Sequence, residues 1–181
     1  MKKIAIVSSN EYTITTFFKN HLNSLHSNYE ITILTKIINK DFLPQMKLKK
    51  INIPINRGYS LFSDLICLIY LVNYFLFNKY DMVFSCTPKG GILSTLAGFI
   101  CRVPNRIHFF TGQVWITRKF IERFLLIRID KLISYLSTDL LTDSISQKNI
   151  LIKADITNID KIKVLGHGSI SGVNTDMFKP N

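Results

Sequence analysis

The chain has 181 residues, 47% of them hydrophobic and 12% aromatic, with 23 Lys and Arg against 12 Asp and Glu. This composition excludes a disordered chain, and the length predicts one domain with a sizeable hydrophobic core. The net charge of +11 favours an anionic partner, such as an acidic lipid or a phosphate-bearing substrate, although a general lysine bias would also explain part of it.

Strands and helices alternate through the first half of the chain. In chain order we expect a strand at Lys3–Val7, a helix at Thr13–Leu25, strands at Tyr29–Leu34 and Ile51–Ile55, and a helix at Ser60–Phe77. The first apolar run is too short for a signal peptide. Asp64 and Asn73 interrupt the long helix, so we expect it to pack against the sheet; shallow insertion into a membrane surface is the alternative.

The second half continues the same alternation. In order we expect a strand at Asp81–Ser85, a tight turn at Thr87–Gly91, a helix at Ile92–Cys101, a strand at Arg106–Phe110, a loop at Thr111–Trp115, a helix at Lys119–Leu136, a strand at Asp139–Leu141, a helix at Ser144–Lys153 and a strand at Lys161–Leu165. Repeated units of this kind predict an α/β fold with a Rossmann-like parallel sheet and helices on both faces. In such sheets ligands bind beyond the carboxyl ends of the strands.

The polar turns after the strands are therefore candidate sites. In the turn at 87–91, Thr87, Lys89, Gly90 and Gly91 would suit a phosphate or a sugar hydroxyl, because glycines allow close approach and Lys89 supplies a cation. An ordinary Pro/Gly turn is the alternative, and the spacing of a P-loop is absent.

A second group of residues is expected to line a cleft. Its members follow the first and fifth strands, and they are Ser9, Asn10, Thr111, Gly112 and Gln113. Trp115 closes the second of these loops and either stacks on a sugar or anchors the core. His108, inside a strand, is expected to be a core residue.

The glycine-rich stretch Gly166–Pro180 follows the last strand and lets the backbone approach a ligand or a neighbouring domain. Its candidate contact residues are Gly168, Ser169, Gly172 and Val173, and its His167 is the histidine for which we consider a functional role.

Metal and nucleic acid are not expected as partners. No His, Cys, Asp or Glu residues have metal-ligand spacing, and Cys67, Cys86 and Cys101 are expected to be buried, reduced thiols. The helix at 119–136 has a basic face formed by Arg118, Lys119, Arg123, Arg128 and Lys131. This face is either simply solvated or rests on anionic lipid, whereas the pattern of a nucleic-acid-binding module is missing.

Four segments in this order resemble bacterial glycosyltransferases of family 4, which have the two-domain GT-B fold. The segments are Thr87–Gly91, His108–Trp115, Thr142–Gln147 and Val164–Pro180. The most similar subset assembles capsule, O-antigen and other glycans on undecaprenyl-diphosphate-linked acceptors. Many members have Gly-x-Gly where this chain has Ser8–Glu11, and a histidine where it has Thr111, so no catalytic residue is carried over.

The resemblance implies the N-terminal half of a GT-B enzyme. Residues 1–165 would form the acceptor-binding domain, and residues 166–181 would begin the crossover to a C-terminal donor-binding domain without a counterpart here. The implied full-length enzyme is a metal-independent, retaining transferase that needs no cofactor. It would use a nucleotide-diphosphate sugar as co-substrate, in the cytoplasm and peripherally at the inner face of the plasma membrane.

Alone, the 181 residues are expected to bind the lipid-linked acceptor without transferring sugar. One alternative is a non-catalytic lipid- or glycan-binding subunit that needs a separate partner chain carrying the C-terminal domain. Another is an α/β domain that binds an unrelated nucleotide, against which the missing dinucleotide and P-loop fingerprints count.

Overall fold

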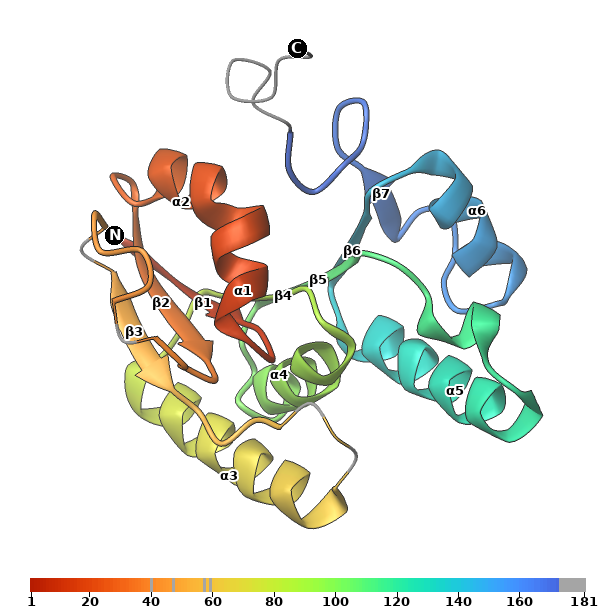
Figure 1. Cartoon of the computed structure of the whole chain (residues 1–181), viewed down its shortest axis with the longest axis horizontal. Coiled ribbons are helices and arrows are strands. Elements are labelled where there is room, and N and C mark those ends of the chain that lie inside the picture. The colour runs from red at the N-terminus through yellow and green to blue at the C-terminus, as the bar shows by residue number, and fades with distance from the viewer. Residues whose placement is uncertain (40, 47, 57, 59, 173–181) are drawn as a thin grey trace.

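The computed structural model describes residues 1–172 apart from 40, 47, 57 and 59. In this part of the chain, seven parallel strands form one sheet in the order β3-β2-β1-β4-β5-β6-β7 (Figure 1). The strands are β1 (Lys2–Val7), β2 (Tyr29–Thr35), β3 (Lys49–Asn52), β4 (Met82–Ser85), β5 (Asn105–Phe110), β6 (Asp139–Thr142) and β7 (Ile162–Val164). The predicted Rossmann-like parallel sheet is therefore confirmed.

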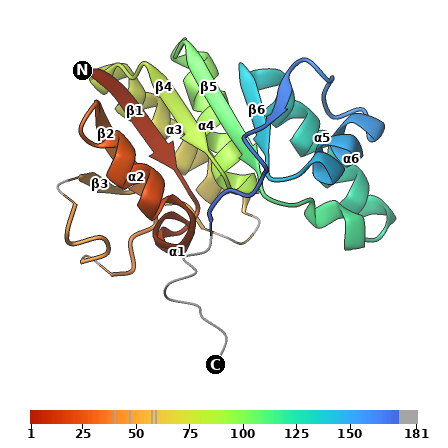
Figure 2. The ribbon, with the colours of Figure 1, turned by 90° about the horizontal axis from the view of Figure 1, so that it is seen from above.

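Helices cover both faces of the sheet, as predicted. They are α1 (Glu11–Thr13), a π-helical segment η1 (Ile14–Phe18), α2 (Lys19–Leu25), α3 (Leu61–Asn78), α4 (Pro88–Ile100), a 3₁₀ turn η2 (Val114–Thr117), α5 (Phe120–Leu136) and α6 (Ile145–Lys153). Helices α1 and α2 lie on one face, and α3, α4 and α5 lie on the other (Figure 2).

Strand β1 shows why this arrangement is stable. Its side chains alternate between the two faces, so Ile4 and Ile6 pack under α2 while Ala5 and Val7 pack against α3 and α4. All four side chains are buried. A strand that is apolar on both faces belongs in the interior of a parallel sheet, and β1 lies there, between β2 and β4.

Two predicted boundaries were wrong. The predicted tight turn Thr87–Gly91 is the first turn of α4, because Thr87 is the N-cap and Pro88 starts the helix. The predicted strand Ile51–Ile55 lies earlier, at Lys49–Asn52, where it pairs with Thr32–Thr35 of β2. The apolar alternation of Ile51, Ile53 and Ile55 misplaced it, since Pro54 has no N–H to continue a ladder.

Helix α3 is only partly the buried helix that we expected. Cys67, Leu71 and Phe75 face the core, but only 17% of the helix is buried. Its length and its mean hydropathy of 1.6 would by themselves suffice for crossing a membrane. Leu61 and Phe62, in its first turn, are 92% and 76% exposed. The helix thus has one face on the sheet and a second apolar face that the described residues leave open.

Candidate functional site

A cavity of about 660 Å³, here called the central cavity, lies at the carboxyl edge of the sheet. From β1 the strand order runs outward to β2 and β3, then returns to β4 on the other side, so β1 and β4 form the switch point at which such sheets bind ligands. Six of the residues predicted from sequence line the cavity, namely Ser9, Asn10, Thr87, Lys89, Thr111 and Gly112. Four residues of the predicted cleft group and two of the predicted phosphate-contact group therefore lie in one cavity.

Thr87 joins the loop after β1 to the start of α4. Its hydroxyl oxygen accepts a hydrogen bond from the Gly90 amide at 3.3 Å and another from the Ser9 amide at 3.1 Å. A Cβ on Gly90 would lie 3.3 Å from Ser8 Cα and 2.6 Å from the Thr87 hydroxyl. Gly90 therefore allows the N-terminus of α4 to approach the β1 loop, and it does not itself line the cavity.

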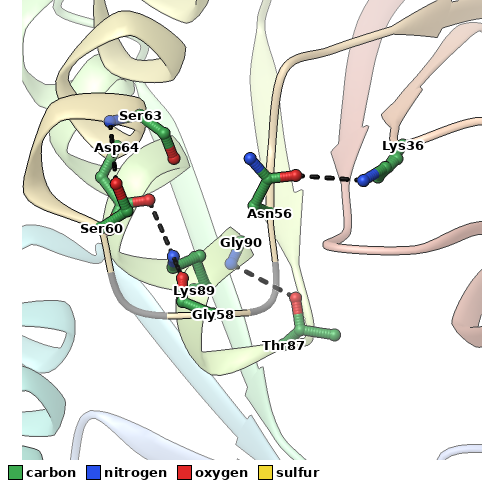
Figure 3. Close-up of polar contacts among 9 residues, drawn as sticks. All are labelled: Lys36, Asn56, Gly58, Ser60, Ser63, Asp64, Thr87, Lys89 and Gly90. Carbon is green, nitrogen blue, oxygen red and sulfur yellow. Dashed lines mark hydrogen bonds and ion pairs between the residues drawn. The ribbon is translucent and has the colours of Figure 1, made fainter.

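Lys89 ties the start of α3 to the start of α4 (Figure 3). Its ammonium lies 2.8 Å from Asp64 Oδ1 and also donates to the Gly58 carbonyl. The Lys89 and Asp64 side chains are 13% and 24% exposed, so this pair is shielded from solvent. Because Asp64 balances its charge, Lys89 contributes little net positive charge to the cavity. Its contact with a phosphate stays a prediction.

His108 forms part of the cavity wall and is a core histidine, as expected. It is 2% exposed, and its Nδ1 lies 2.9 Å from the Ser85 hydroxyl. Burial lowers the pKa of His108 to about 3, so the imidazole is neutral at physiological pH. Gly91 makes room for it, because a Cβ there would lie 2.5 Å from His108 Cε1. Packing on the sheet therefore explains why position 91 is a glycine.

Gln147 positions the loop after β5. The side-chain amide is oriented so that its nitrogen faces hydrogen-bond acceptors and its oxygen faces a donor. In this orientation the nitrogen donates to the Phe110 carbonyl at 2.7 Å and to Asp143 Oδ1 at 2.8 Å. Its oxygen then accepts from the Gly112 amide at 2.7 Å. Sequence reasoning gave Gln147 no role; a glutamine within the first turn of a helix, just after a strand, was the available signal.

Gln113, predicted to line the cleft, does not line the cavity. Its side-chain nitrogen is buried without a hydrogen-bond partner among the described residues.

Trp115 is the core anchor rather than an exposed stacking platform. It is 4% exposed and packs with Phe110 and Ile133. Its indole Nε1 donates to Asp130 Oδ2 at 2.8 Å. Asp130 is 8% exposed and lines the cavity, and burial raises its pKa to about 6 even though the Trp115 hydrogen bond acts in the opposite direction. The sequence places Asp130 on the predicted helix at 119–136 and gives no sign that its carboxylate is buried.

The glycine-rich loop folds back on the sheet. Gly168 has a φ of +98° and a Cβ there would lie 2.4 Å from the Asp143 carbonyl, so only glycine fits. The Ser169 amide donates to the same carbonyl at 2.7 Å. Neither residue lines the central cavity, and His167 is exposed. Gly172 is also exposed, and Val173 lies outside the described residues.

No metal-binding cluster of His, Cys, Asp or Glu occurs within the described residues. The three cysteines are free thiols, with Cys67 and Cys86 buried and Cys101 half-buried. Burial raises the pKa of Cys86 to about 12, so it is not a nucleophile at neutral pH.

The sequence of this chain is similar to that of a known glycosyltransferase. The chain is 35% identical over 127 residues to the capsular polysaccharide biosynthesis glycosyltransferase CapM of Staphylococcus aureus. The matched residues make up 70% of this chain and 33% of CapM. No protein-family model matches. The chain thus spans about a third of the length of this relative.

Solved structures resemble the fold. UDP-GlcNAc 2-epimerase from Methanocaldococcus jannaschii has a TM-score of 0.67 at 20% identity, covering 91% of this chain and 45% of that one. MurG from Acinetobacter baumannii has a TM-score of 0.60 at 10% identity, covering 93% and 46%. The epimerase was also solved in complex with UDP-GlcNAc and UDP. The fold is consistent with the N-terminal half of GT-B enzymes, and the sequence similarity supports a glycosyltransferase-like domain.

Proposed function

We propose that this chain is the acceptor-binding N-terminal domain of a glycosyltransferase in cell-surface polysaccharide synthesis. The substrates would be a nucleotide-diphosphate sugar and a glycan linked to a lipid diphosphate of the undecaprenyl type. The similarity to CapM supports the reaction class. The observation that carries the proposal is the central cavity, which lies at the switch point and is bordered by an apolar surface.

A second depression continues from the cavity along α5. This α5 groove has a volume of about 490 Å³ and an apolar floor that includes Leu125 and Leu132. Arg118, Leu126 and Ile129 line both the central cavity and the α5 groove. The central cavity combines hydrogen-bonding groups such as Asn10 and Asp130 with apolar walls, and it opens past Arg118 into the apolar groove. This arrangement suits an amphipathic ligand, with a sugar inside, a phosphate near Arg118 and an alkyl chain outside.

The same edge of the molecule carries exposed apolar side chains. We call them the apolar rim: Leu61, Phe62, Leu65 and Ile69 of α3 and Phe120, Ile121, Phe124 and Leu125 of α5, all at least 52% exposed. Exposed basic residues accompany the rim on α5, among them Lys119 and Arg128. Apolar and cationic side chains together favour peripheral binding to an anionic membrane, which here would be the cytoplasmic leaflet of the plasma membrane.

The donor would approach from the side of the glycine-rich loop, as the resemblance predicted for Gly168, Ser169 and Gly172. Gly168 and Ser169 lie against Asp143, just beyond the carboxyl end of β6, and the Ser169 amide donates to the Asp143 carbonyl. Donor binding would need the C-terminal half of a GT-B enzyme, whether on the same polypeptide or on a partner chain. The 181 residues alone would therefore bind the acceptor without transferring sugar.

Acceptor binding can be tested by filling the cavity. Val114→Trp puts an indole into the cavity from η2, where Val114 is 44% exposed, and should weaken calorimetric binding of citronellyl-diphosphate-linked N-acetylglucosamine about tenfold or more. Ile116→Trp is the matched control, because Ile116 lies on the same turn, is 49% exposed and does not line the cavity. Equal weakening by both variants, or none by Val114→Trp, would contradict the assignment of the cavity.

The claim that the domain needs a second half is tested separately. The chain is incubated with a panel of UDP-sugars and the same lipid-linked acceptor, with and without a polypeptide carrying a GT-B C-terminal domain. Transfer by the chain alone would contradict the proposal. Binding of acceptor without transfer, even when the second polypeptide is present, would favour the alternative of a non-catalytic binding subunit.

A further inference from the structure

The carboxylate of Asp130 is a buried charge in the central cavity without a matching cation. Its side chain is 8% exposed, and the indole Nε1 of Trp115 donates to Oδ2 at 2.8 Å. Across residues 1–172, leaving aside the four gaps, Asp130 makes no ion pair and no further side-chain hydrogen bond. Oδ1 is therefore an acceptor without a partner at the wall of a 660 Å³ cavity.

The other charged groups around the cavity do not compensate Asp130. Lys89, on the side of α3 and α4, is paired with Asp64. On the side of α5, Arg118 pairs with Glu122 at 3.6 Å, and the Arg123 guanidinium lies 5.6 Å from the centre of the Trp115 ring. From β5, His108 faces the cavity as a neutral imidazole.

The fold does not need this negative charge. An amide oxygen would accept the same Trp115 hydrogen bond, and it would avoid the desolvation that raises the pKa of Asp130. Desolvated, uncompensated charges cluster at functional sites because ligand binding, not folding, makes use of them. The position of Asp130 in the cavity wall is consistent with such a use.

We propose that Asp130 binds hydroxyl groups of a saccharide in the central cavity, with Trp115 as the residue that positions its carboxylate. This inference rests on the proposed function. A carboxylate has acceptors only, and sugar hydroxyls are neutral donors that it can bind through charge-assisted hydrogen bonds. Apolar side chains of Val114, Leu126 and Ile129 line the same cavity and offer contacts for the C–H groups of a sugar ring.

The charges also set the orientation of the ligand. A diphosphate would be repelled by the Asp130 carboxylate, whereas the α5 groove carries Arg118 and Arg128 against the single carboxylate of Glu122, so its net positive charge attracts the diphosphate. The sugar therefore points inward to Asp130 and the diphosphate lies at the mouth. The first sugar of a lipid-linked acceptor is thus the part that Asp130 recognises.

The test compares pairs of probes that differ only in the sugar. The methyl ester of citronellyl diphosphate, which carries the same charge as the sugar conjugates, is titrated beside the citronellyl diphosphate conjugates of N-acetylglucosamine, glucose and galactose. Quenching of Trp115, the single tryptophan of the chain, reports binding. At pH 7.5 the best conjugate should bind the native chain about tenfold more tightly than the sugar-free probe. Asp130→Asn should abolish most of this gain without weakening the binding of the sugar-free probe, because the carboxylate that it removes repels the diphosphate. Asp160→Asn, which alters an exposed carboxylate, should keep the gain.

Protonation of the Asp130 carboxylate offers a second test. If Asp130 binds the sugar, the sugar-dependent gain in affinity should change with pH, whereas a purely structural role would not make it do so. At pH 5 the native chain should lose the sugar-dependent gain, while Asp130→Asn should show the same small gain at both pH values. If Asp130→Asn keeps the full gain, the inference is overturned and the proposed function stands. If no conjugate binds the native chain more tightly than the sugar-free probe, the inference is overturned as well. If none of the probes binds at all, the proposed function fails with it.

Discussion

At the scale of single residues, the cavity wall contains two buried titratable side chains, His108 and Asp130, and packing explains only one of them. Burial keeps His108 neutral, and its Ser85 partner satisfies Nδ1. Burial also destabilises the charged form of Asp130, yet the raised pKa of about 6 leaves it ionised at pH 7.5. His108 is therefore explained by packing, whereas Asp130 retains an unbalanced charge that packing does not explain.

The raised pKa of Asp130 predicts how stability changes with pH. Because the folded state holds this proton more tightly than the unfolded state, the protonated group favours folding below about pH 4, and that advantage is lost as pH rises through about 6. Asp130→Asn removes the penalty and keeps the Trp115 hydrogen bond, so above pH 7 the variant should be more stable by about 3 kcal/mol. Chemical denaturation from pH 4 to pH 8 measures this, and the two curves should converge at the acid end. A difference that does not change with pH would contradict the prediction.

Gly91, in the first turn of α4, packs so closely against the sheet that a larger residue should destabilise the fold. Gly91→Ala should lower the free energy of unfolding by about 1–3 kcal/mol, because the new Cβ would lie 2.5 Å from His108 Cε1 and 3.2 Å from Ile133 Cδ1. Gly172→Ala is the control, since nothing lies within 4 Å of a Cβ there. Urea unfolding of both variants makes the comparison. A near-neutral Gly91→Ala would mean that His108 can move away from α4.

At the scale of secondary-structure elements, local pattern predicted the order of strands and helices but not the surroundings of each element. The strands β1 and β4 were predictable because an interior parallel strand is apolar on both faces. The start of α4 was missed because a Thr-Pro-Lys-Gly-Gly sequence is read as a turn, although Thr87 and Pro88 are equally good cap and first-turn residues. Four of the five predicted cleft residues line the central cavity, because the topology brings the loops after β1 and β5 to one edge, but Gln113 does not. Asp130 was not predicted because its hydrogen-bond partner Trp115 belongs to a different element.

The ion pair between α3 and α4 should matter more than those at the surface. Lys89→Met removes the ammonium that meets Asp64 at 2.8 Å and should cost about 1–3 kcal/mol, because it leaves a shielded carboxylate without its cation. Lys163→Met breaks a pair with Asp139 whose side chains are 61% and 43% exposed, and it should cost under about 1 kcal/mol. Thermal unfolding of both variants at one pH tests the ranking. Adding Asp64→Asn to Lys89→Met should recover part of the loss.

At the scale of the whole molecule, the parallel topology places the cavity and the apolar rim at the same edge. Helices that connect parallel strands run antiparallel to them, so α3, α4 and α5 all begin at the carboxyl edge of the sheet (Figure 1). Leu61 and Phe62 at the start of α3 and Phe120 and Ile121 at the start of α5 are all at least 73% exposed. A membrane against this edge would therefore meet the mouth of the central cavity.

This geometry predicts which substitutions weaken membrane binding. The double variant Phe62→Gln, Phe120→Gln should reduce flotation with vesicles that contain phosphatidylglycerol about tenfold or more, because each phenylalanine is 76% or more exposed and would bury its ring in the interface. The matched control is Ile100→Gln, Ile159→Gln. These residues are 52% and 63% exposed and lie at the opposite edge of the sheet, Ile100 as the last residue of α4 and Ile159 before β7.

Salt separates the two components of this binding. Raising the ionic strength should weaken the native chain by screening the basic residues of α5, but it should leave the difference between native chain and double variant nearly unchanged, because apolar insertion is not screened. Equal loss in the rim variant and the control would mean that the molecule has no preferred orientation on the membrane. The lipid-linked acceptor would then have to reach the central cavity through solution, and the shared location of cavity and rim would be without consequence for the acceptor.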